Sequence, residues 1–347
     1  MFESKNLYYY IFAFSVIAVS GYFAKKFKKN FEDNNDEYEL IKKYLLNDSP
    51  LYGYNKPKIW IHTKYETNAR KWKSFYSRTS NDLNEPYIHL TIKTIINHCS
   101  NDFNVCLIDD DTFSKLIPSW DIDISQVAEP MKHHFRELGL LQLVYYYGGM
   151  VVPNSFVCLR NLKSLYDEGI QGNVPFVCEN VNRTMDNANK TNHLLFVPDL
   201  NFFGASKNDE TIKALIEYLK KKNQSPHFSS EPDFLGDSSN WCLNAIMKNK
   251  MTLVGGELIG VKNQKRKAIL LDDLMEENFL DLNKSAYGIY IPNEELLRRH
   301  KYKWFAVINE HTIMNSNTII CKYLKASIVD STSEYSKPPQ IRSVVSI

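Results

Sequence analysis

Apolar and polar positions alternate along the chain in blocks that predict strands and helices in turn. Residues 56–63, "KPKIWIHT", form an apolar burst that ends in His62-Thr63, as expected of a buried strand. Residues 84–99 carry apolar side chains at helical spacing, and residues 103–117 predict a second strand, three aspartates and a short helix. This order predicts an α/β domain with a largely parallel sheet flanked by helices.

A later block, "LLQLVYYYGGMVVPNSF", predicts a helix that passes into a third strand. Gly148-Gly149 can supply the left-handed helix terminator, Met150–Val152 is the strand, and Pro153 ends or bends it. Further strands are predicted in "VPFVCE", "LNFFGAS", "MTLVGGELIGV" and "YGIYIP", and further helices in "NDETIKALIEYLKKK", "SSNWCLNAIMK", "NEELLRRHKYKWF" and "NEHTIMNSNTIICKYL".

Polar residues at the predicted strand ends are the first candidates for a ligand site. Ligands of parallel α/β sheets bind outside the carboxyl ends of the strands. The residues in that position are His62, Thr63 and the run Asp109-Asp110-Asp111.

The N-terminal stretch from Leu7 to Ala24 contains no charged residue. As a helix it would be roughly 27 Å long, which just spans a bilayer core. "KKFKK" follows it directly, so a retained single-pass anchor is favoured over a cleaved signal peptide, for which the small residues around Ala18 are the argument. The positive flank places the large domain on the cytosolic side; sequons at Asn182, Asn189 and Asn283 support the alternative, a lumenal domain.

Composition shifts divide the chain into four segments. We expect a membrane anchor at 1–24, a linker at 25–55 that becomes acidic and Asn-rich from residue 30, a folded domain at 56–325 and a mobile, Ser/Pro-rich tail at 326–347.

Charge and cysteine usage exclude several classes of protein. Lys+Arg of 42 against Asp+Glu of 40 leaves a formal charge of +2, which gives no electrostatic case for a nucleic-acid partner. The six cysteines form no C-x-x-C pair, so a zinc or thioredoxin-like motif is unsupported. We expect them to be buried free thiols.

Three blocks together resemble the GT-A type glycosyltransferases that include capsular polysaccharide synthesis proteins and the DXD-containing, mannosyltransferase-like sugar transferases. They are "KPKIWIHT", "FNVCLIDDDTF" and "LLQLVYYYGGMVV", and "DLNFFGASKND" resembles the strand and loop that face the acceptor. The resemblance covers about residues 56–325. It implies a Rossmann-related GT-A fold, a nucleotide-sugar donor, a glycan or lipid-linked acceptor, and Mn²⁺ or Mg²⁺ held by an Asp-x-Asp motif. Lys, Asn, Ile, Tyr and Phe are abundant, which fits an AT-rich coding sequence. Such a coding sequence is compatible with a family member from a large DNA virus.

The chain departs from this pattern at two places. Pro153-Asn154-Ser155 stands where the family has Asp-x-Asp, and neutral Asn and Ser are weak ligands for a hard cation. The family's Ser-Asp-x-x-Arg corresponds to residues 136–140, where Glu137 keeps an acid but Leu140 replaces the arginine. By resemblance, Glu137, Gly148 and Gly149 join the donor-binding candidates, and the cation-dependent mechanism is expected to be lost.

Two kinds of residue remain as candidates for metal binding. Asp109 and Asp111 could hold a cation in place of the missing motif, although capping of the helix that begins near Thr112 is the favoured interpretation. His133 and His134 point about 100° apart on a helix and are poor co-ligands.

Two functions therefore stay open at this point. The chain transfers a sugar from a nucleotide sugar to a glycan or lipid-linked acceptor, or it is an inactive pseudo-glycosyltransferase that serves as a binding or scaffold protein at a membrane. Catalytic residues, donor and acceptor identity, and oligomeric state are not indicated by the sequence.

Overall fold

The computed structural model describes residues 56–63, 85–128, 131–182, 194–224 and 231–335, all within the second of two compact units, residues 51–347. Among these residues, no helix combines the length and the apolar content needed to cross a bilayer. The predicted anchor at 7–24 and the linker at 25–55 lie outside the described residues, so both stay predictions.

A six-stranded mixed sheet forms the centre of this unit, with strand order β2-β1-β3-β6-β5-β7. Its strands are β1 (Lys58–His62), β2 (Asn104–Ile108), β3 (Gly149–Val151), β5 (Phe176–Val181), β6 (Phe196–Ala205) and β7 (Thr252–Val254). β1 pairs in parallel with both β2 and β3, and β7 pairs in parallel with β5, whereas β6 runs antiparallel to its two neighbours. The predicted α/β class with a mixed, mostly parallel sheet is confirmed.

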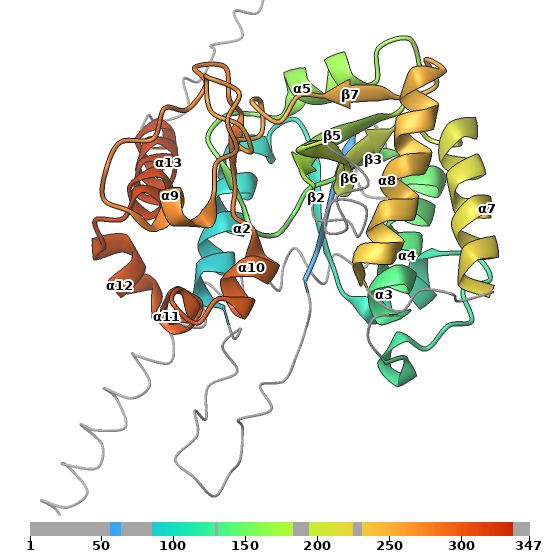
Figure 1. The fold of residues 1–347 in the computed structure, drawn as a ribbon, viewed down its shortest axis with the longest axis horizontal. Helices are drawn as coiled ribbons and strands as arrows, with labels where there is room; N and C mark the ends of the chain where they lie inside the picture. Colours follow the sequence, from blue (N-terminus) through green and yellow to red (C-terminus); the bar gives the residue numbers. More distant parts are fainter. Residues whose placement is uncertain (1–55, 64–84, 129–130, 183–193, 225–230, 336–347) are drawn as a thin grey trace, which may run out of the picture. The chain divides into compact units, whose positions relative to one another are not determined.

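Helices lie on both sides of the sheet, as Figure 1 shows. The longer ones on one side are α4 (Met131–Tyr147), α7 (Glu210–Gln224) and α8 (Glu231–Met247), together with the short α3 (Asp110–Leu116) and a 3₁₀ turn (Ile124–Gln126). Their apolar faces and the sheet share one core, in which Trp60, Val144 and Phe203 are buried. The side chains of Ile59, Trp60 and Ile61 in β1 are fully buried, as expected of a central strand covered on both faces.

The other group of elements packs around α2 (Pro86–Cys99). It includes a second, two-stranded sheet of β4 (Phe156–Cys158) and β8 (Gly288–Tyr290). Its helices are α9 (Leu271–Met275), α10 (Asn293–Arg298), α11 (Lys303–Val307), α12 (Glu310–Asn315) and α13 (Ile319–Tyr335). α5 (Lys163–Gly169) contacts β7 of the six-stranded sheet instead. α2 contacts both β4 and α13. β4, which follows β3 in the chain, therefore packs in this second group of elements and not in the six-stranded sheet.

Several local predictions differ from the structure. The helical segments "NEELLRRHKYKWF" and "NEHTIMNSNTIICKYL" each form two helices, α10 with α11 and α12 with α13, and β4, α5 and α9 are not predicted by the sequence pattern. α12 ends because its C-cap residue, Ser316, is in an extended conformation. α13 then continues to Tyr335, beyond the predicted domain end at residue 325, and buried Leu324 and Ile328 fix its first turns. Residues 336–347 of the predicted tail lie outside the described residues.

At the boundary between α4 and β3, Gly148 and Gly149 adopt backbone conformations that only glycine adopts easily. Gly148 and Gly149 have φ angles of +71° and +99°, and the Gly148 N–H donates to the Val144 carbonyl at 2.8 Å. A Cβ on Gly149 would lie 2.2 Å from the Lys58 carbonyl oxygen of β1. The glycine pair therefore allows β3 to start directly beside β1.

His134 lies fully buried on α4. We therefore expect the free energy of unfolding to depend on pH. Burial lowers the pKa of His134 to about 4, against about 6.5 in an unfolded chain. Below about pH 6.5 the unfolded state therefore takes up a proton that the folded state does not. The free energy of unfolding should fall by roughly 3 kcal/mol in total as the pH drops from about 6.5 to about 4.

Urea unfolding of the full chain between about pH 7 and about pH 5 checks this slope. His134→Leu should flatten it, whereas His133→Leu, at the partly exposed neighbouring position, should leave it in place. An equally steep slope in the His134→Leu variant would show that another group takes up the proton.

Candidate functional site at the strand ends

The carboxyl ends of the parallel strands meet at one edge of the sheet. His62 pairs in register with Ile108, and Trp60 with Val151, so the residues that follow β1, β2 and β3 lie side by side. The chain goes from β1 to β2 on one side and returns to β3 on the other side of β1. This reversal of strand order is the place where open α/β sheets bind ligands.

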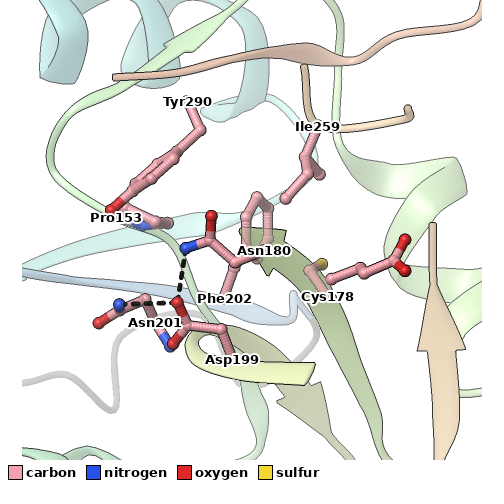
Figure 2. Close-up of a pocket in the computed structure, with 9 residues that line it drawn as sticks. Pro153, Cys178, Asn180, Asp199, Asn201, Phe202, Ile259 and Tyr290 are labelled. Carbon is pink, nitrogen blue, oxygen red and sulfur yellow. Dashed lines mark hydrogen bonds between the residues drawn. The ribbon is translucent and has the colours of Figure 1, made fainter. Parts of the chain in front are cut away.

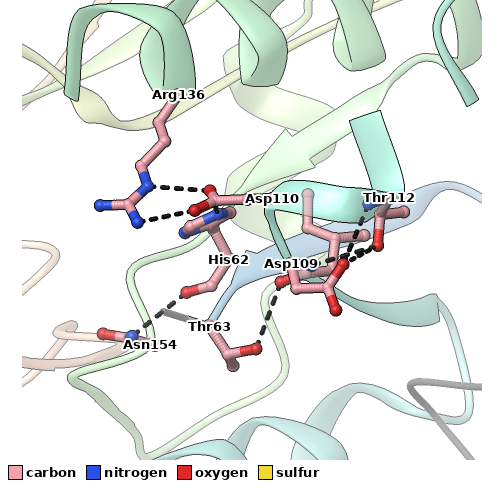
Figure 3. A network of polar contacts seen from close by, with 8 residues as sticks. His62, Thr63, Asp109, Asp110, Thr112, Arg136 and Asn154 are labelled. Carbon is pink, nitrogen blue, oxygen red and sulfur yellow. Dashed lines mark hydrogen bonds and ion pairs between the residues drawn. The ribbon is translucent and has the colours of Figure 1, made fainter. Parts of the chain in front are cut away.

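A partly buried charge cluster occupies this edge, and Figure 3 shows it. Asp110 accepts two hydrogen bonds from Arg136, from Nε at 2.8 Å and from Nη2 at 2.7 Å. His62 Nε2 lies 3.0 Å from Asp110 Oδ1, and the His62 ring stacks on Phe113 with centroids 5.7 Å apart. One carboxylate thus holds an arginine fork from α4 and a histidine from β1.

The charges of this cluster balance within it, because Asp110 is paired with Arg136 and His62. Burial by itself would raise the pKa of Asp110, but the hydrogen bonds from Arg136 and His62 outweigh it and hold that pKa well below its usual range. Asp110 is therefore ionised at neutral pH and neutralises the guanidinium beside it. A diphosphate that approached Arg136 would have to compete with Asp110.

The other two aspartates of the run have separate roles. Asp109 Oδ1 accepts the Thr112 backbone N–H at 2.9 Å, and the Thr112 hydroxyl oxygen accepts the Asp109 N–H at 3.2 Å, which is a capping box. Asp111 is exposed in the first turn of α3. The capping interpretation is confirmed for Asp109, and a cation held by Asp109 and Asp111 stays a prediction.

Thr63 closes the end of β1 against β2. Its N–H and its hydroxyl both donate to the Ile108 carbonyl, at 2.8 Å and 3.2 Å, and the residue is buried. Contact of His62, Thr63 or Asp110 with a nucleotide stays a prediction, but each of these side chains already has a partner within the fold.

The segment Pro153-Asn154-Ser155 bridges this edge to the second sheet. Asn154 Nδ2 donates to the His62 carbonyl at 3.1 Å, and the Asn154 carbonyl accepts the Thr91 hydroxyl at 2.5 Å. The Ser155 hydroxyl donates to the Ile291 carbonyl at 2.7 Å, and the Ile291 N–H donates to the Ser155 carbonyl at 3.1 Å. Ser155 is only 2% exposed, so its side chain faces protein rather than a ligand.

Mn²⁺ or Mg²⁺, expected from the resemblance, does not fit the residues at this place. Hard cations need several convergent oxygen ligands, carboxylates above all. Pro153 has no donor, and the polar hydrogens of Asn154 and Ser155 are directed at main-chain carbonyls. In the part of the chain that the structure describes, no three His, Cys, Asp or Glu side chains come together to hold a metal ion.

Arg136 was not predicted as a site residue, although the sequence contained a signal for it. The resemblance placed an arginine at position 140, where this chain has Leu140. Arg136 lies four residues earlier on α4, and residues four apart share a helix face. Predicted candidate Glu137 is buried instead beside Cys242, whose pKa is raised by burial and by this carboxylate.

A second polar cluster lies in a small recess beside Pro153 and is shown in Figure 2. The Asp199 carboxylate accepts Asn180 Nδ2 at 2.5 Å, the Asn201 N–H at 2.9 Å and Asn201 Nδ2 at 3.1 Å. Tyr290 of β8 lines the same recess. Its cavity volume of about 10 Å³ has room for about one water.

An irregularity in the β5–β6 ladder creates this cluster. Val177 pairs with Phe203 but Cys178 pairs with Asp199, so three residues of β6 bulge out of the ladder. Bulges often lie next to functional sites, where they redirect side chains. In the sequence, this cluster is indicated only by Asp199 and Asn201 within an otherwise apolar stretch. The resemblance assigns that stretch to an acceptor-facing strand and does not single out Asp199.

A partly buried ion pair borders the recess on the side of β5. Lys262 Nζ is bonded to Glu179 Oε2, which also accepts the Gly256 N–H at 3.1 Å. The Lys262 ammonium lies 4.1 Å from the centroid of the Phe196 ring. Glu179 thus neutralises Lys262 and ties the loop after β7 to the sheet edge.

Comparison with known proteins places the chain near glycosyltransferases only in overall shape. No protein-family model and no curated protein matches the sequence. The apo form of the glycosyltransferase GlyE from Streptococcus pneumoniae TIGR4 aligns with a TM-score of 0.38 and 10% identity, over 81% of this chain and 64% of the GlyE chain. Mouse xyloside xylosyltransferase 1 aligns with a TM-score of 0.36 and 7% identity, over 58% of this chain and 86% of that chain.

The galactosyltransferase LgtC, solved in complex with donor and acceptor sugar analogues, aligns with a TM-score of 0.31 and 10% identity, over 58% of this chain and 74% of LgtC. This chain spans less than two thirds of GlyE. The described unit is thus structurally similar to these glycosyltransferases at low identity, and scores at this level assign neither activity nor substrate.

Proposed function

We propose that this chain is a GT-A-like glycosyltransferase relative that binds a carbohydrate or nucleotide sugar at the strand-end edge without cation-dependent transfer. The observation that carries the proposal is the segment Pro153-Asn154-Ser155. Asn154 Nδ2 and the Ser155 hydroxyl donate to the main-chain carbonyls of His62 and Ile291, at the strand end where the resemblance implies carboxylates. A leaving diphosphate would find no cation there to offset the charge that develops on it.

The recess beside Pro153 supports carbohydrate recognition. A carboxylate flanked by two amides offers acceptors and donors to adjacent sugar hydroxyls, and Tyr290 adds an aromatic side chain. Because the recess holds about one water, a sugar enters only if Asn201 or Tyr290 moves. Asn201 is exposed and Tyr290 is partly exposed, so both side chains have solvent to move into.

A second candidate, cation-independent sugar transfer, is favoured by Asp199 itself. Its carboxylate lies in the same recess as Pro153, where a donor sugar would be expected from the resemblance. In that case the Asp199 carboxylate serves as the acid–base group of the reaction. Hydrolysis of the donor then requires this carboxylate but no metal.

Titration of the full chain, purified with detergent present, tests both candidates. UDP, GDP and their sugars are added with Mn²⁺ or with a chelator, and heat of binding and donor hydrolysis are followed. We expect metal-independent sugar binding that Asp199→Asn weakens at least about tenfold, since one charged hydrogen-bond partner contributes about 1.5–3 kcal/mol. Asp167→Asn, on the exposed face of α5, is the matched control and should bind normally.

The outcomes separate the alternatives. Hydrolysis that persists with chelator and disappears in Asp199→Asn establishes the second candidate. Binding and turnover that both require Mn²⁺ overturn the proposal, and no binding of any sugar or nucleotide overturns carbohydrate recognition.

We further propose that residues 7–24 anchor the chain in a membrane with the large domain in the cytosol. The uncharged stretch and the basic "KKFKK" after it support this orientation. A glycosylation reporter fused after residue 347 should stay unmodified. Modification of the reporter, or protection of the domain from added protease in sealed vesicles, would place it in the lumen.

A further inference from the structure

Two buried cysteines from distant parts of the chain lie next to each other. Cys99 ends α2 and Cys158 ends β4, and their Sγ atoms are 3.9 Å apart. Both side chains are fully buried. Both are free thiols in this structure, as all six cysteines are.

Hydrogen bonds along α2 hold these two residues in register. The Thr91 hydroxyl donates to the Asn154 carbonyl at 2.5 Å, and the Thr94 hydroxyl accepts the Cys158 N–H at 2.9 Å. Thr91 and Thr94 thus face residues 154–158, and Cys99 lies at the end of the same helix. The main chain around both sulfurs is fixed before any bond forms between them.

We propose that Cys99 and Cys158 are a covalent modification site, forming a disulfide that locks α2 to β4 when the full chain folds in the presence of a low-molecular-weight disulfide. The sulfurs have to close from 3.9 Å to about 2.05 Å, and the Cys158 thiol has to give up its hydrogen bond to the Arg160 carbonyl, at 3.0 Å. The other four cysteines lie on β2, β5, α8 and α13 and contribute no sulfur to this contact.

A low-molecular-weight disulfide such as oxidised glutathione supplies the oxidising equivalents. The Cys99 thiolate attacks one glutathione sulfur and displaces the first glutathione thiolate. The Cys158 thiolate then attacks the Cys99 sulfur of the mixed disulfide and displaces the second. The two cysteine sulfurs lose two electrons together, one glutathione disulfide becomes two thiols, and the two cysteine protons end on the released glutathiones.

Burial decides when this reaction occurs. The Cys158 pKa is raised well above its usual value, first by burial and then by the neighbouring Cys99, so the folded interior disfavours the attacking thiolate. We expect the bond to form during folding or local opening, and to stay closed to reductants afterwards. β4 follows Ser155 directly, so the cross-link would also fix the strand-end edge described above.

The test compares full chain folded with reduced or with oxidised glutathione, by peptide mapping and thermal unfolding. With oxidised glutathione we expect a Cys99–Cys158 peptide pair, lighter by two hydrogen atoms than the separate thiols, and a Tm several degrees higher. Cys321→Ala should keep both effects, whereas Cys99→Ala and Cys158→Ala should lose the pair and the Tm increase.

Two results overturn the proposal. One is that both thiols remain alkylatable after folding with oxidised glutathione. The other is that the oxidised chain links either residue to a different cysteine. Peptide mapping reads the pairing directly, so the result does not depend on whether the alanine variants fold well. The outcome is also independent of sugar binding, since neither sulfur lies in the Asp199 recess.

Discussion

Ser155→Asp is expected to destabilise the protein strongly and not to create a cation site. The introduced carboxylate would lie in a fully packed position, facing the Ile291 carbonyl that now accepts the Ser155 hydroxyl at 2.7 Å. Two acceptors would then face each other, and the charge would lack a partner. We expect the free energy of unfolding to fall by more than about 3 kcal/mol, as for other unpaired buried charges.

Denaturant unfolding of the full chain, with and without Mn²⁺, measures this effect. Ser155→Ala should cost only about 1 kcal/mol, because it removes one hydrogen bond without adding a charge. Pro153→Asp is the matched acidic control at a partly exposed position. If Ser155→Asp were as stable as Ser155→Ala and were stabilised further by Mn²⁺, the site would be a cation site that lost only its ligands.

Gly149→Ala is expected to disrupt the pairing of β1 with β3. Its Cβ would lie 2.2 Å from the Lys58 carbonyl oxygen and 2.9 Å from the carbonyl carbon, and main-chain atoms of a central strand cannot move aside. The φ of +99° adds strain of its own. We expect a loss of about 4 kcal/mol or more, or failure to accumulate as folded protein.

Gly148→Ala is the control for this prediction. Its φ of +71° is also in the left-handed region, but the nearest atom to a new Cβ is the Lys207 nitrogen, at 3.1 Å. The expected loss is about 1–2 kcal/mol, the usual cost of a left-handed residue with a side chain. Circular dichroism and urea unfolding of both variants give the comparison, and equal stability of the two would contradict the role assigned to Gly149.

The local pattern predicted the elements around the site well. β1, α2 and β2 each carry an apolar run of the right length, and the glycine pair marks the boundary between α4 and β3. These signals are local, because burial of a strand or one helix face leaves its period in the sequence. α13 begins within a predicted helical segment and runs to Tyr335, into the Ser- and Thr-rich stretch for which the composition predicts a mobile tail.

The candidate site was predicted only in part. Strand-end residues His62 and Asp110 were singled out, and the structure brings them together. Arg136 and Asp199 were missed, because one is displaced by a helix turn from the expected position and the other depends on a bulge in strand pairing. Neither feature leaves a periodic pattern in the chain.

The sequence by itself predicted most of the strands and helices, though not β4, α5 or α9, and it placed Pro153-Asn154-Ser155 at the end of β3, where the resemblance implies two carboxylates. Only the tertiary structure decided what these residues do. Ser155 meets Ile291 across 136 positions, and Asn154 meets His62 across 92. Residue identity fixes which atoms can donate or accept, but the partner is fixed by long-range packing, which brings together segments whose own patterns contain no trace of each other.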